Sequence, residues 1–101
     1  MKKFQNKKLL MLGSSLGTIE MIKYAQDNGC HVIVTDYLPK EKSAGKMIAD
    51  ESADISTTDI DSLEIFARKK NIDGVFCGVS EINLKSVKAL CDRLNLPCYY
   101  T

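Results

Sequence analysis

Short runs of apolar residues alternate with longer amphipathic segments along the whole chain. The apolar runs lack polar alternation, which is typical of strands buried on both faces of a parallel sheet. They predict five strands, at residues 8–12, 31–35, 53–56, 74–78 and 97–100. Segments with apolar residues three and four positions apart predict helices at residues 18–28, 44–49, 61–70 and 81–94.

The regular alternation of strands and helices indicates how these elements are arranged. Crossovers between parallel strands are right-handed, so we expect an α/β fold with a doubly wound, parallel, five-stranded sheet of order 3-2-1-4-5 and helices on both faces. Ligands bind such sheets at the carboxyl ends of the strands, where the winding reverses. This switch point would lie between strands 8–12 and 74–78, so the loops at 13–17 and 78–81 are expected to meet there.

A turn of small residues follows the first strand. It consists of Gly13, Ser14, Ser15, Leu16 and Gly17. Exposed N–H groups and the start of a helix favour capture of an anion or carboxylate here, although a tight turn without a ligand is an equally good interpretation. The segment resembles the opening of a Rossmann-like unit. Ser15 and Thr18 replace the second and third glycines of the dinucleotide fingerprint, which makes a classical NAD site less favoured.

Three further residues at the carboxyl ends of strands are candidates for binding. Asp36 could bind a ribose 2′-OH, but a solvated acid that caps the loop at Tyr37 is the favoured interpretation. Ser80 is expected to cap the last helix. Glu81 could reach a substrate ammonium or hydroxyl, or simply complement the N-terminus of that helix.

Composition excludes several classes of function. The formal net charge is +1, so no global field attracts nucleic acid or a membrane surface. No apolar run approaches a membrane helix or a signal peptide, and we expect a cytoplasmic location. The four cysteines show no C-x-x-C spacing and are expected to be reduced, buried hydrophobes. Asp50, Glu51 and Asp54 are interpreted as a solvated edge, without metal-ligand spacing, and His31 as a structural residue.

Several short motifs together resemble a known family. They are the ADE run at 49–51, ADIST at 53–57 with Asp59, DGV at 73–75, Ser80-Glu81 and Leu96-Pro97. In this order they are similar to the N-terminal, pre-ATP-grasp domain of ATP-grasp ligases, in the carbamoyl-phosphate-synthase-like or carboxylate–amine ligase branch. The resemblance spans residues 1–101 as one domain and implies that this domain is a fragment of a longer ligase.

The resemblance implies a function for the longer protein. ATP would phosphorylate a carboxylate, and an amine or another nucleophile would attack the acyl phosphate. ATP and Mg²⁺ would belong to the later domains, so no cofactor is expected within this fragment. Its expected partners are a small-molecule carboxylate or amine and the C-terminal ATP-grasp domain. Carried over, Gly13, Ser14, Ser15 and Gly17 form one wall of an acceptor-substrate pocket, and Ser80 and Glu81 form another.

Two alternatives remain beside this interpretation. The chain could be a regulatory module that binds a nucleotide or dinucleotide, with Asp36 on the ribose. It could also be a structural domain that only docks its neighbour.

Overall fold

Four parallel strands form the sheet in the part of the chain that the computed structural model describes, residues 6–13, 16–78 and 81–98. The strands are β1 (Lys8–Leu12), β2 (His31–Asp36), β3 (Glu51–Asp54) and β4 (Gly74–Cys77). Their order is β3-β2-β1-β4, and Leu10 of β1 is level with Ile33 of β2 and Val75 of β4. The α/β class, the parallel direction and the order of the first four strands are therefore confirmed.

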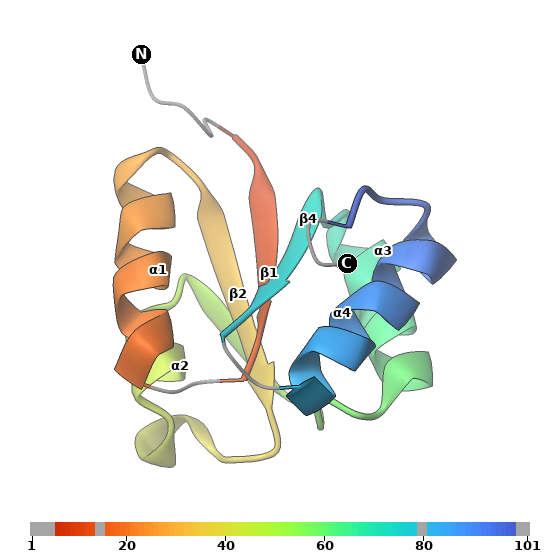
Figure 1. The fold of residues 1–101 in the computed structure, drawn as a ribbon. Helices are drawn as coiled ribbons and strands as arrows, with labels where there is room; N and C mark the ends of the chain where they lie inside the picture. The colour runs from red at the N-terminus through yellow and green to blue at the C-terminus, as the bar shows by residue number, and fades with distance from the viewer. Residues whose placement is uncertain (1–5, 14–15, 79–80, 99–101) are drawn as a thin grey trace.

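Helices cover both faces of this sheet. They are α1 (Leu16–Asp27), α2 (Ala44–Ile48), α3 (Ile60–Lys70) and α4 (Glu81–Leu94), with a 3-10 turn η1 (Lys40–Lys42). Figure 1 shows α1 and α2 on one side of the sheet and α3 and α4 on the other. This is the arrangement that right-handed crossovers impose when the chain winds outward from β1 in both directions. Among the described residues, no helix has the length and apolar character needed to cross a membrane.

Two apolar clusters pack against the two faces of β1. Leu10 and Leu12 belong to the cluster under α3 and α4, whereas Met11 belongs to the cluster under α1. All three side chains are fully buried. Successive strand residues point to opposite faces, so an uninterrupted apolar run is required here. The sequence pattern at 8–12 therefore identified the central strand correctly.

The predicted fifth strand at 97–100 is not observed. Residues 96–98 are irregular, and residues 99–100 lie outside the described part. Residues 95 and 96 instead form the C-terminal cap of α4. Asn95 has a left-handed φ of 58°, and the Leu96 N–H donates to the Cys91 carbonyl at 2.9 Å. This is the hydrogen bond of a Schellman motif. Pro97 has no N–H to donate to a neighbouring strand.

Two other elements begin two residues earlier than predicted, and the bounds of the remaining observed strands and α-helices agree within one residue. Helix α1 begins at Leu16, so Gly17 lies in its first turn and not in a loop. Strand β3 occupies 51–54, two residues earlier than predicted, because Glu51 pairs in register with Ile33. Glycine does not interrupt the first helical turn, where the N–H groups lack intrahelical acceptors in any case.

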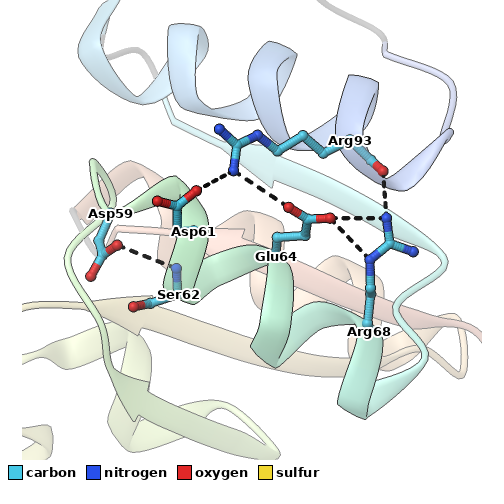
Figure 2. Close-up of polar contacts among 6 residues, drawn as sticks. All are labelled: Asp59, Asp61, Ser62, Glu64, Arg68 and Arg93. Carbon is cyan, nitrogen blue, oxygen red and sulfur yellow. Dashed lines mark hydrogen bonds and ion pairs between the residues drawn. The ribbon is translucent and has the colours of Figure 1, made fainter.

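Polar contacts join α3 to α4 on the outer surface, as Figure 2 shows. Arg93 of α4 donates to Asp61 at 2.5 Å and to Glu64 at 3.4 Å, and Arg68 donates to the Arg93 carbonyl at 2.7 Å. Asp59 caps α3, since its carboxylate accepts the Ser62 N–H. Asp61, in the first turn of α3, pairs with Arg93. Exposed pairs of this kind contribute little individually.

Candidate functional site

The carboxyl edge of the sheet brings together Gly13, at the end of β1, and Asn83, in the first turn of α4. Gly13 has a φ of +87°, and its N–H donates to the Thr35 carbonyl at 2.7 Å. A Cβ atom at Gly13 would lie 2.7 Å from the Asn83 Nδ2. That Nδ2 donates to the Leu12 carbonyl at 3.4 Å. The end of β1 and the start of α4 therefore meet at the predicted switch point, and a side chain at position 13 would displace the Asn83 amide.

The other predicted site residues lie around this contact. Leu16 and Gly17 are in the first turn of α1, and Glu81 is the first residue of α4. The structure describes these three by their backbone. Ser14, Ser15 and Ser80 lie outside the described residues. The roles assigned to these side chains stay predictions, but two helices of 12 and 14 residues begin at this edge. Their free N–H groups and dipoles suit an anionic ligand.

Thr35 adds a buried hydroxyl to the same edge. Its side chain is fully buried, and its Oγ1 has no hydrogen-bond partner among the residues that the structure describes. Thr35 is level with Leu12 on the neighbouring strand, one residue before Gly13. An unpaired buried hydroxyl is costly, because it loses its hydrogen bonds to water without replacement.

Replacing Thr35 by valine is expected to leave the free energy of unfolding unchanged or to raise it by about 1 kcal/mol, because valine keeps the shape and removes the unpaired oxygen. Urea denaturation of the wild type and of Thr35→Val measures this difference. Thr35→Ser is the matched control, since it keeps the hydroxyl, loses a methyl group and should be destabilised by roughly 1 kcal/mol. A Thr35→Val variant less stable than Thr35→Ser would show that the hydroxyl is bonded.

Asp36, the last residue of β2, lies in a buried polar cluster. The prediction that it is a solvated acid is therefore wrong. One carboxylate oxygen accepts the Leu38 N–H at 2.8 Å, and the other accepts the Ser43 hydroxyl at 3.1 Å. The first bond is the loop cap that the sequence suggested. Lys46 of α2 lies 3.3 Å from the same carboxylate and donates to the Asp36 carbonyl at 3.1 Å. Both carboxylate oxygens are thus engaged within the chain.

Lys46, which no sequence pattern singled out as a site residue, is fully buried at the centre of this cluster. Its Nζ also donates to the Leu38 carbonyl and, at 2.7 Å, to Asp54. The register explains the burial: Asp36 and Asp54 are level with each other at the ends of β2 and β3. Two carboxylates side by side repel each other, and a cation between them removes that repulsion. The signal that the sequence contains for this arrangement is that each of two adjacent strands, β2 and β3, ends in an acidic residue.

Asp50 and Glu51 are also engaged, so the interpretation of 50–54 as a solvated edge is wrong in part. Asp50 accepts the Val32 N–H at 2.8 Å. Glu51 lies 2.8 Å from both the His31 Nε2 and the Lys70 Nζ. The Lys70 ammonium and then His31 lower the pKa of the Glu51 carboxyl by hydrogen bonding to its charged form. His31 thus has a structural partner, as predicted.

Solved structures similar to this chain supply the family context. The phosphoribosylglycinamide synthetase of Anaerococcus prevotii matches 90% of the chain at 27% identity and a TM-score of 0.76, and this chain spans 23% of that protein. The N5-carboxyaminoimidazole ribonucleotide synthetase of Thermotoga maritima matches 86% at 27% identity and a TM-score of 0.66, again with 23% of its length covered. The match is to the N-terminal part of these ATP-grasp enzymes.

This chain has the fold of a pre-ATP-grasp domain. The resemblance drawn from the short motifs is therefore confirmed. The N5-carboxyaminoimidazole synthetase of Staphylococcus aureus, solved in complex with ADP, shares the fold at 21% identity and a TM-score of 0.74 over 96% of the chain. The chain spans about a quarter of the length of these structures. No protein-family model and no curated protein matches its sequence.

Metal-ligand clusters and thiols are two kinds of reactive group that the described part of the chain allows to be assessed. No group of three or more His, Cys, Asp or Glu side chains there could hold a metal ion. The cysteines are free thiols, and Cys30, Cys77 and Cys91 are buried, as predicted. Burial raises the pKa of the Cys30 thiol, and raises that of Cys91 to about 11. These two thiols are protonated at neutral pH and unsuited to nucleophilic attack.

Proposed function

We propose that this pre-ATP-grasp domain forms the acceptor-substrate side of an ATP-dependent ligase that joins a carboxylate to an amine. The observation that carries the proposal is the likeness, over 90% of the chain, to the N-terminal part of phosphoribosylglycinamide synthetase. The meeting of Gly13 and Asn83 at the carboxyl edge supports it, because ligands of doubly wound sheets bind at this position.

The reaction divides between this domain and the rest of the ligase. ATP transfers its γ-phosphoryl group to a carboxylate, and the amine then displaces phosphate from the acyl phosphate, giving an amide, ADP and phosphate. ATP and Mg²⁺ belong to the ATP-grasp part, and no step through a metal ion is assigned to the residues of this domain. The N–H groups at the starts of α1 and α4 would hold an anionic group of the acceptor near the reacting atoms.

Phosphate release by the longer ligase tests this proposal. Residues 1–101 alone should release no phosphate from ATP, whereas the longer polypeptide should release it only with both a carboxylate and an amine present. Phosphoribosyl amines and amino acids are the first substrates to test. Two similar proteins are named as synthetases of phosphoribosylglycinamide and of a carboxyaminoimidazole ribonucleotide, and both names indicate phosphoribosyl compounds. ATP hydrolysis by residues 1–101, or a longer polypeptide without any ATP-grasp part, would contradict the proposal.

A nucleotide-binding regulatory role, with Asp36 on a ribose, has less support. Both Asp36 oxygens already accept hydrogen bonds from Leu38 and Ser43, and the nearby Lys46 compensates its charge. A ribose would have to displace these partners, of which Ser43 and Lys46 are buried.

Calorimetric titration of the domain with NAD, NADPH and AMP is therefore expected to give dissociation constants weaker than about 1 mM. The reason is that the carboxylate needed for the ribose is already hydrogen-bonded. Asp36→Asn is the matched variant, since it keeps the shape and removes the charge. Micromolar binding by the wild type that Asp36→Asn abolishes would favour the regulatory role over the ligase.

A further inference from the structure

An open apolar groove lies between α1 and β4, with a volume of about 610 Å³. Met21 and Tyr24 of α1 form one wall, and Phe76 of β4 forms the other. Leu9 of β1 lies between them. The groove is on the α1 face of the sheet and extends toward the amino ends of β1 and β4, so it is distinct from the carboxyl edge that carries the candidate site.

The winding of the sheet explains why this groove is open. Right-handed crossovers place α1 and α2 over the β1-β2-β3 half of one face, and α3 and α4 on the other face. In the described part of the chain, β4 therefore has no helix above it on the α1 side. Continuing the same winding beyond β4 would add helices to the face of α4. A segment that covers the groove therefore has to be one that does not belong to the alternating strands and helices of this sheet.

The side chains at the groove are large for a surface that faces only water. Tyr24 is 55% exposed, and Met21 and Phe76 are only partly buried although they pack against the core. Lys7 and Glu20 bring opposite charges to the rim. An apolar centre with a polar rim is the usual composition of a surface that receives another protein element.

We propose that the groove receives an apolar face of the ATP-grasp part of the same polypeptide. The inference rests on the proposed function, in which this chain is the N-terminal quarter of a longer ligase. Similar ligases are about four times as long as the chain, and a longer ligase of this kind has a large further part available to cover the groove. A second copy fits less well, because a twofold interface brings the same surface together and two concave grooves do not interdigitate.

Thiol labelling of the longer polypeptide tests the inference. Tyr24→Cys places a reactive group in the groove, and Ile65→Cys places one on α3, where the side chain is 71% exposed. Maleimide is expected to label Tyr24→Cys at least about tenfold more slowly than Ile65→Cys, because the groove must open first. The unsubstituted polypeptide provides the background of the native thiols.

Three outcomes would overturn the inference or its basis. Equal labelling of Tyr24→Cys and Ile65→Cys in a polypeptide that contains an ATP-grasp part would overturn the docking inference and leave the proposed function intact. Protection of Tyr24→Cys that disappears on dilution would identify a second copy as the occupant and also overturn it. A longer polypeptide without an ATP-grasp part would remove the proposed function itself.

Discussion

Replacing Lys46 by methionine is expected to lower the free energy of unfolding by about 3–5 kcal/mol, because it leaves the buried Asp36 carboxylate without its cation. Methionine has nearly the same length, so packing changes little. Two backbone carbonyls, of Asp36 and Leu38, also lose their donor. Small domains have only about 5–15 kcal/mol of stability, so this single change removes much of it. The urea midpoint of the domain measures the loss.

Two matched variants separate the buried charge from the exposed one. Asp54→Asn removes the partner whose side chain is 67% exposed, and is expected to change stability by less than about 1 kcal/mol. Combining Lys46→Met with Asp36→Asn removes both buried charges and should recover part of the loss. A Lys46→Met variant as stable as the wild type would mean that the ammonium contributes no net stability.

Local patterns predicted the four observed strands and their order, but not the polar cluster around Lys46. The strand at 8–12 is apolar at Leu9, Leu10, Met11 and Leu12, and burial on both faces demands that pattern. Lys46 has no such signature, since it lies in a five-residue helix close to two exposed lysines. Its burial follows from the pairing of Asp36 with Asp54, 18 residues apart, which depends on the register of β2 and β3. The periodicity within each segment does not identify which residue of β2 lies level with which residue of β3.

The candidate site was predictable in position but not in its contacts. The topological rule places ligands between β1 and β4, and this is where Gly13 and Asn83 meet. In the sequence, Asn83 is one polar residue near the start of the predicted helix at 81–94. Its contact with the Leu12 carbonyl spans 71 residues, so no local rule could predict it. Thr35 was likewise hidden, because a β-branched residue in a strand is ordinary and only the structure shows that its hydroxyl is unpaired.

Replacing Gly13 by alanine is expected to disturb both the fold and acceptor binding. A φ of +87° costs a side-chain-bearing residue about 1–2 kcal/mol. The added Cβ would also approach the Asn83 Nδ2 to 2.7 Å, so Asn83 must move away from the Leu12 carbonyl. The hydrogen bond that joins the start of α4 to the end of β1 would then be lost. In the longer ligase we expect the KM for the acceptor to rise about tenfold, because N–H groups at this edge lose their alignment.

Gly29→Ala is the control that separates strain from function. Gly29 has a φ of +88°, almost the same as Gly13, but it follows the C-terminal end of α1 at the opposite edge of the sheet. Both variants should lose similar stability from the backbone, and only Gly13→Ala should raise the KM. Adding Asn83→Ala to Gly13→Ala relieves the steric contact but not the strain, so the double variant should lose less stability than the two single losses combined. Equal effects of Gly13→Ala and Gly29→Ala on the KM would show that the carboxyl edge does not contact the acceptor, since general destabilisation alone would then account for both.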